Sequence, residues 1–155
     1  MRAVVQRVTR AEVRVEAELV GSIGPGLCVL VGAGHGDDEH SARRLAERIA
    51  TLRIHADGEG RMNLDLAAAG GEVLVVSQFT LYADASRGHR PSFLAAGPPE
   101  LGLRLYEAFC AALRERGLRV ETGRFGAHMQ VELENDGPVT VVLSSGEPPW
   151  PADAG

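Results

Sequence analysis

The chain has 155 residues, of which 45% are hydrophobic and 24% are charged, and a formal net charge of -5. These values are typical of one soluble globular domain, and no apolar run approaches the roughly 20 residues that a membrane-spanning helix needs. The acidic balance argues against broad, sequence-independent binding of nucleic acid, and we expect no DNA partner.

The N-terminal part is predicted to consist of β-strands. Residues 1–8 alternate loosely, and they carry charge too early for a secretory signal peptide, so we expect a cytoplasmic protein. Residues 11–17 alternate apolar and charged side chains, as in a strand with one solvated face. Residues 18–23 and 26–32 are two further strand candidates, separated by a Gly-Pro turn. This pattern predicts a β-meander.

The next segment, Gly32-Ala33-Gly34-His35-Gly36, has the glycine content of a phosphate-binding loop but not its spacing. A dinucleotide fingerprint needs a third glycine three positions after the second, where this chain has Asp37, and no Gly-Lys-Ser/Thr is present. We therefore interpret the segment as a strand-to-helix connection, with Asp37 or Asp38 as the helix N-cap. The apolar face of that helix is predicted at Ala42, Leu45, Ile49 and Leu52.

The acidic turn Asp57-Gly58-Glu59-Gly60 resembles a calcium loop, but it lacks the required ligand spacing and the closing Glu, so it predicts a hairpin. The two cysteines, Cys28 and Cys110, lie far apart in apolar surroundings and behave as small hydrophobic residues. The sequence predicts no metal site and no cofactor.

Residues 72–82 are predicted to form a buried strand that becomes polar at Ser77, Gln78 and Thr80. Buried polar groups cost a few kcal/mol each when they have no partner. These side chains are therefore either satisfied internally or available for a ligand.

Residues 83–99 form a long irregular segment, which in a compact domain is usually functional or mobile. Arg87 and Arg90 are its candidates for a phosphate contact, with ordinary solvated charges as the alternative. A second helix is predicted from Pro99 or Glu100 to about Arg116, with Gly117 as its C-terminal stop.

The C-terminal part is predicted to contain strands at residues 118–122, 129–134 and 139–143. Asn135-Asp136-Gly137-Pro138 is predicted to close a hairpin between the last two strands. The proline-rich tail, residues 144–155, shows no apolar period and is expected to be poorly ordered, with Trp150 as a lone packing anchor.

These elements predict an α+β fold in which antiparallel or mixed sheets form a sandwich or barrel-like core with two main helices packed outside. Residues 1–143 would form a single domain, followed by the tail. Packing alone does not explain the polar residues of the central strand or the Gly137-Pro138 turn. A Gly-Pro turn can aim two backbone carbonyls in one direction, and an X-Pro bond is the one place where a cis peptide is inexpensive.

Five segments of the chain resemble the D-aminoacyl-tRNA deacylase (D-tyrosyl-tRNA deacylase) family. They include Ser77-Gln78-Phe79-Thr80 within residues 75–81 and Asn135-Asp136-Gly137-Pro138 within residues 129–140. The other three are residues 6–11, 87–93 and 122–125, so the resemblance extends over residues 1–143.

The resemblance implies a homodimeric enzyme that hydrolyses the ester joining a D-amino acid, or glycine, to the 3′ terminal adenosine of tRNA. It implies that Ser77, Gln78, Phe79 and Thr80 line the catalytic pocket and that Met129 contributes to it. It also implies that Gly137-Pro138 is cis and enters the pocket of the partner subunit. Its carbonyls would hold the substrate amino group and leave no room for an L side chain.

Two mechanisms remain open from the sequence. Thr80 could attack the ester carbonyl, but a threonine hydroxyl is a weak nucleophile without an adjacent base. We favour the alternative, in which backbone N–H groups around Phe79 and Thr80 stabilise the oxyanion and the neighbouring ribose 2′-hydroxyl assists water. The rival functions are a deacylase acting chiefly on mischarged glycyl-tRNA and a non-catalytic tRNA- or nucleotide-binding module.

Overall fold

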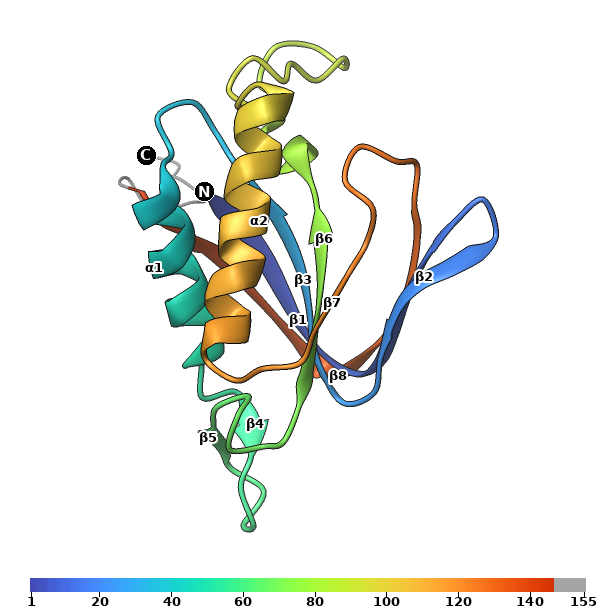
Figure 1. The fold of residues 1–155 in the computed structure, drawn as a ribbon, viewed down its shortest axis with the longest axis vertical. Helices are drawn as coiled ribbons and strands as arrows, with labels where there is room; N and C mark the ends of the chain where they lie inside the picture. The colour runs from blue at the N-terminus through green and yellow to red at the C-terminus, as the bar shows by residue number, and fades with distance from the viewer. Residues whose placement is uncertain (147–155) are drawn as a thin grey trace.

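The computed structural model describes residues 1–146, which form a mixed β-sheet with two helices, α1 (Glu39–Ala50) and α2 (Pro99–Glu115), on one face (Figure 1). The strand order is β2-β1-β3-β6-β7, and β8 also pairs with β1. The bounds of the main strands are β1 (Arg2–Val15), β2 (Glu18–Ile23), β3 (Gly26–Gly32), β6 (Glu72–Ser77), β7 (Val120–Thr122) and β8 (Gln130–Ser144). A separate small sheet pairs β4 (His55–Ala56) with β5 (Met62–Leu64), which confirms the predicted hairpin.

The N-terminal strands do not form the predicted meander. Residues 1–8 and 11–17 belong mostly to one continuous strand, β1, because nothing between them stops an extended chain. β2 and β3 follow one another along the same edge of β1, β2 against its C-terminal half and β3 against its N-terminal half. The turn from β1 to β2 has positive φ at Glu16 (49°) and Ala17 (66°), the conformation of a two-residue hairpin turn.

β3, β6 and β7 run parallel to one another at the other side of the sheet. The four consecutive residues 73–76 of β6 are all buried, as expected for a strand covered on both faces. At Gly21 of β2, an added Cβ would lie 2.6 Å from the carbonyl oxygen of Thr122 in β7. The two ends of the sheet therefore approach each other, and the mixed sheet is nearly closed into a barrel, as the predicted fold class allowed.

The two helices cover one face of this sheet and form the larger part of the core. Asp38 is the N-cap of α1 and accepts a hydrogen bond from the Ser41 N–H at 2.8 Å. α2 begins at Pro99, and Gly117 follows its C-cap with φ of 80°. These boundaries confirm both predicted helices, but Leu52, predicted on the apolar face of the first, lies beyond the helix because α1 ends at Ala50 with Thr51 as its C-cap. Fully buried core side chains from the helices and strands include Leu45, Ile49, Leu105, Phe109 and Val29.

β8 replaces the two strands and the hairpin predicted for residues 129–143. Both of its halves pair antiparallel with β1, so the chain does not reverse direction at Gly137-Pro138. Instead, residues 136–139 bulge out between the pairs Val8↔Asn135 and Gln6↔Thr140. The hairpin prediction is wrong because both flanking segments find the same distant partner strand.

The central strand is shorter than predicted. β6 ends at Ser77, and the 3-10 helix η1 (Phe79–Tyr82) replaces the strand expected through residue 82. At the C-terminus, β8 includes Ser144, and the Ser145 N–H donates to the Met1 carbonyl at 2.9 Å. Most of the predicted tail, including Trp150, lies outside the described residues. Among residues 1–146, neither helix has the length and apolar character needed to cross a membrane.

Candidate functional site

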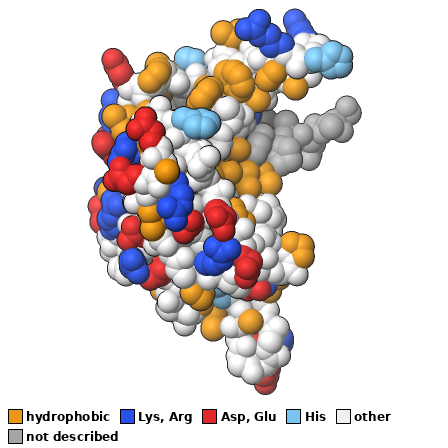
Figure 2. Space-filling model, turned by 90° about the vertical axis from the view of Figure 1, so that its right-hand side faces the viewer, with side chains coloured by type: hydrophobic (Ala, Val, Ile, Leu, Met, Phe, Trp, Pro, Cys, Tyr) orange, Lys and Arg blue, Asp and Glu red, His pale blue; other side chains and the backbone are white. Residues whose placement is uncertain are grey.

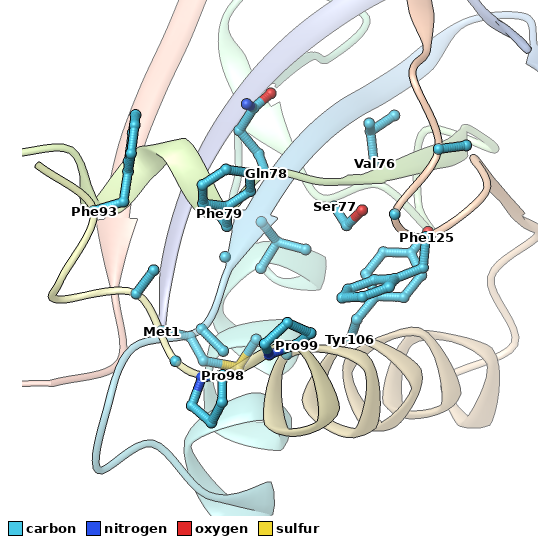
Figure 3. A pocket seen from close by; sticks show the side chains of 18 of the residues that line it. Met1, Val76, Ser77, Gln78, Phe79, Phe93, Pro98, Pro99, Tyr106 and Phe125 are labelled. Carbon is cyan, nitrogen blue, oxygen red and sulfur yellow. The ribbon is translucent and has the colours of Figure 1, made fainter. Parts of the chain in front are cut away.

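A cavity of about 730 Å³ lies beyond the C-terminal ends of the parallel strands β3 and β6 (Figure 3). Ligands of sheets that contain parallel strands commonly bind at this end. Four stretches form the walls: the end of β3 with its following loop, the end of β6 with Phe79, residues 93–102, and residues 125–131. Met1 and Tyr106 complete them.

The inner wall of the cavity is apolar and aromatic. Tyr106 and Phe125 lie side by side, with ring centroids 5.8 Å apart, close to Ser77 (Figure 3). The Tyr106 hydroxyl donates to the Val75 carbonyl at 2.8 Å. Burial raises the pKa of Tyr106, so this hydroxyl stays protonated and serves as a structural donor.

The mouth of the cavity exposes large apolar side chains. The ring of Phe79 is 58% exposed, and it meets Phe93 edge to face with centroids 5.2 Å apart. The adjacent Leu94 is 88% exposed. Such a contiguous apolar rim is typical of a surface that binds a ligand.

Three of the four predicted catalytic residues, Ser77, Gln78 and Phe79, line the cavity, whereas Thr80 does not. The Gln78 side-chain amide donates to the Thr80 hydroxyl, so these two polar groups are satisfied internally, one of the two alternatives that the sequence left open. Among residues 1–146, the Ser77 hydroxyl has no hydrogen-bond partner. It is therefore available to a ligand.

The backbone at the start of η1 also presents free donors. The Gln78 N–H donates to the Val31 carbonyl at 2.8 Å, but the N–H groups of Phe79 and Thr80 find no acceptor in the described part of the chain. The first N–H groups of any helical turn lack intrahelical partners. No His, Asp or Glu of residues 1–146 is hydrogen-bonded to the Thr80 hydroxyl.

Met129 lines the cavity from the segment before β8. Its sulfur accepts a hydrogen bond from the Arg124 N–H at 3.4 Å and lies against Gly123, where an added Cβ would be 2.6 Å away. His35 and His128 also belong to the lining, and sequence reasoning missed both as pocket residues. No local pattern marks either one, because distant segments bring them to the cavity.

Gly137 and Pro138 lie outside this cavity, and their peptide bond is cis. The Asn135 side chain closes the bulge, because its oxygen accepts from the Val139 N–H at 2.9 Å and its nitrogen donates to the Val139 carbonyl at 3.1 Å. Arg7 donates to the Asp136 carbonyl at 3.0 Å. The turn belongs to β8 and Ser77 belongs to β6, and the strands β1 and β3 lie between them. Three interstrand spacings of about 4.8 Å therefore separate β8 from β6.

Arg87 and Arg90 lie in the exposed segment between η1 and α2, which forms no helix or strand. Figure 2 shows basic and histidine side chains gathered on the projection at the top of the molecule, where Figure 1 draws this segment. The segment is tied at its base by the Asp84 and Ser92 backbone pair, with both hydrogen bonds at 2.8 Å. The described residues contain no cluster of three or more His, Cys, Asp or Glu suited to a metal ion.

Residues 4–144 match the family model described as D-Tyr-tRNA(Tyr) deacylase. The chain is 60% identical to a D-aminoacyl-tRNA deacylase from Anaeromyxobacter dehalogenans (strain 2CP-C), covering 94% of this chain and 97% of that protein. It is 56% identical to a D-aminoacyl-tRNA deacylase from Thermus aquaticus, covering 96% of this chain and 98% of that protein.

Solved structures share the fold. One, described as c-Myc DNA Unwinding Element Binding Protein, is 40% identical with a TM-score of 0.88, over 94% of this chain and 99% of that chain. Another, described as a probable eukaryotic D-amino acid tRNA deacylase, is 19% identical with a TM-score of 0.78, over 92% of this chain and 97% of that chain. At that identity the second likeness concerns the fold alone.

Proposed function

Because the chain belongs to the D-Tyr-tRNA(Tyr) deacylase family, we infer that it hydrolyses the ester bond of D-aminoacyl-tRNA and releases the free D-amino acid and tRNA. It is thus a carboxylic ester hydrolase with tRNA as its macromolecular substrate. A cytoplasmic location is part of the proposal, since aminoacyl-tRNA is made and used there.

The cavity beside Ser77 is the proposed site of hydrolysis, and the observation that carries this is its combination of apolar walls with a few free polar groups. The aromatic rim of Phe79 and Phe93 would contact the 3′ terminal adenosine, and Met129 would contact the bound aminoacyl group. The free hydroxyl of Ser77 would orient the ester, while the Gln78 amide braces the start of η1 through Thr80.

The backbone N–H groups of Phe79 and Thr80 would stabilise the oxyanion that forms when water attacks the ester carbonyl. Both are unpaired in residues 1–146, and fixed donors aimed at developing negative charge commonly supply the largest part of ester-hydrolysis catalysis. The ribose 2′-hydroxyl next to the ester would assist the water. Within residues 1–146, no His, Asp or Glu is hydrogen-bonded to the Thr80 hydroxyl, which argues against a covalent acyl-threonine.

The D-selectivity would come from a second copy of the chain. Gly137-Pro138 does not line the cavity of its own chain, yet Asn135 and Arg7 hold it in one conformation at the surface. In a homodimer, the partner's turn would enter the cavity and present its carbonyls to the substrate amino group. Rigid backbone groups discriminate mirror images well because they have no rotamers to adjust.

Arg87 and Arg90 would bind phosphates of the tRNA. Both are exposed and lie in the same segment as Phe93 and Leu94, which line the cavity, and a guanidinium pairs well with phosphate. This local basic patch is compatible with the overall charge of -5.

The proposal is tested by following ester loss from matched D-Tyr-tRNA and L-Tyr-tRNA. We expect the D-ester to be hydrolysed at least about 100-fold faster, because the L side chain has no space in the composite site. Equal rates on both esters would refute the selectivity, and binding of tRNA without release of amino acid would instead indicate a non-catalytic module.

A second candidate substrate is glycine attached to a non-cognate tRNA. Glycine has no side chain, so a site that rejects L-amino acids by excluding their side chains cannot reject glycine in this way. Comparing the rates on D-aminoacyl and glycyl esters of the same tRNA separates a chiral proofreader that tolerates glycine from an enzyme that acts chiefly on it.

A further inference from the structure

The glycine-rich segment before α1 connects the two walls of the cavity. Together with Asp37 we call it the Gly32–Asp37 loop. On one side, the Ala33 carbonyl accepts from the Gly97 N–H at 2.9 Å, and Gly34 pairs with Ala96 in an isolated β-bridge. On the other side, a Cβ at Gly32 would lie 2.5 Å from the Gln78 carbonyl oxygen. The glycines therefore permit close approach of backbones, although they do not form a phosphate loop.

The Asp37 carboxylate is the point where this loop joins η1. Its Oδ2 accepts from the Gly34 N–H at 2.8 Å and from the Tyr82 hydroxyl at 3.0 Å. Its Oδ1 accepts from the Met1 ammonium group and from the Ser145 hydroxyl, the latter at 3.4 Å. The side chain is only 13% exposed, so loss of its charge would leave several donors without an acceptor.

Tyr82 is the last residue of η1, and it contacts Arg2, Gly34 and Asp37. The Arg2 guanidinium lies 4.3 Å from its ring centroid, and a Cβ at Gly34 would overlap the ring from a second direction. Burial and the neighbouring Asp37 raise the pKa of the Tyr82 hydroxyl, so it remains a donor to that carboxylate. Arg2 also donates to the Leu81 carbonyl at 2.9 Å.

We propose that Asp37 and Tyr82 are positioning residues, which fix the η1 wall of the cavity relative to the wall at residues 96–98. This inference depends on the proposed use of the η1 backbone in ester hydrolysis. η1 has four residues and no side-chain cap, so its own hydrogen bonds do little to hold it. Backbone donors must stay within about 0.5 Å of their productive positions, and the Asp37–Tyr82 contact supplies that constraint from outside the turn.

The test compares Tyr82→Phe, Asp37→Asn and the control Asp57→Asn. Asp57 is a matched control because it also accepts backbone N–H groups, from Glu59 at 2.9 Å and Arg61 at 3.0 Å, but in the distant hairpin turn. With D-Tyr-tRNA, we expect kcat to fall about tenfold in Tyr82→Phe and further in Asp37→Asn, while KM changes less than about twofold. Asp57→Asn is expected to keep kcat within about twofold even if its Tm falls.

Hydrogen exchange of residues 77–83 provides a second measurement, which we expect to be faster in Tyr82→Phe than in the unaltered protein. Tyr82→Phe removes one oxygen and keeps the ring, so it tests the contact even if Asp37→Asn does not fold. The inference is overturned if folded Tyr82→Phe retains both its kcat and its exchange rates. An unaltered protein that does not hydrolyse D-Tyr-tRNA would instead overturn the proposed function, independently of the exchange result.

Discussion

The Thr80 hydroxyl is held by the Gln78 amide, which indicates a structural use of this side chain rather than a chemical one. We expect Thr80→Ala to keep kcat for D-Tyr-tRNA within about threefold, because the backbone N–H groups survive the substitution. Loss of a true nucleophile typically costs on the order of 10⁴-fold or more. Thr51→Ala is the control, since the Thr51 hydroxyl donates to the Glu47 and Arg48 carbonyls at 2.9 and 3.3 Å at the end of α1 and does not line the cavity. A trapped acyl-Thr80 adduct would contradict the backbone mechanism.

His55 is a second residue whose environment has a measurable consequence. It is 8% exposed, and its Nε2 is buried without a partner among residues 1–146. Burial, and secondarily the charge of Arg7, lower its pKa, while Asp136 and Asp65 act in the opposite direction. The folded protein thus favours the neutral imidazole beside the segment that holds Asp136.

The pH dependence of stability tests this assignment. In the unfolded chain His55 takes up a proton near pH 6.5, whereas the folded state resists protonation to lower pH. The contribution of neutral His55 to the free energy of unfolding is therefore complete above about pH 6.5. It is lost as the pH falls toward the lowered pKa of the folded state. We expect His55→Leu to flatten the decline of Tm between about pH 6.5 and 5. An unchanged slope in His55→Leu would contradict the assignment.

Among the elements, the bulge in β8 has the most specific role in the proposed function. Gly137 has a φ of 142°, and an added Cβ would lie 2.8 Å from the Val139 nitrogen and 2.6 Å from its Cγ2. We expect Gly137→Ala to displace the turn and reduce D-Tyr-tRNA hydrolysis at least about tenfold, with weaker exclusion of L-Tyr-tRNA. Gly58→Ala is the control, because nothing lies within 4 Å of a Cβ there. If folded Gly137→Ala keeps both rates, the turn has no part in selectivity.

The sequence predicted elements well where the signal was local. Asp38 and Gly117 mark helix ends through capping chemistry, and the Asp57 turn marks a hairpin. The failures concern strand partners. Asn135-Asp136-Gly137-Pro138 has the composition of a reversing turn, but pairing with β1 on both sides keeps the chain in one direction. No local pattern encodes that distant partner.

In the molecule as a whole, the residues of the candidate site were likewise predictable only where the sequence signal was local. Ser77 and Gln78 were predictable as cavity residues because polar residues at the end of an apolar strand are costly without a role, whereas Phe79 was expected there only from the family resemblance. Tyr106, Phe125 and His128 were not, since Tyr106 has the spacing of a core helix residue and the other two lie in a short loop. Tyr106 reaches the cavity from α2, and Phe125 and His128 reach it from the segment between β7 and β8.

We propose that each complete site combines the cavity of one chain with the Gly137-Pro138 turn of another. Complementation between two impaired variants tests it most directly. Ser77→Phe fills the cavity but leaves the turn intact, and Gly137→Leu distorts the turn but leaves the cavity intact. Each variant alone is expected to hydrolyse D-Tyr-tRNA at least about tenfold more slowly than the unaltered protein.

The measurement is the D-Tyr-tRNA hydrolysis rate of an equimolar mixture after the subunits have been allowed to exchange. Random reassortment makes half of the dimers mixed, and each mixed dimer has one intact site of two, so we expect about a quarter of the unaltered activity. A mixture that is no more active than the sum of its two components, although mass measurement shows mixed dimers, would contradict a site shared between subunits.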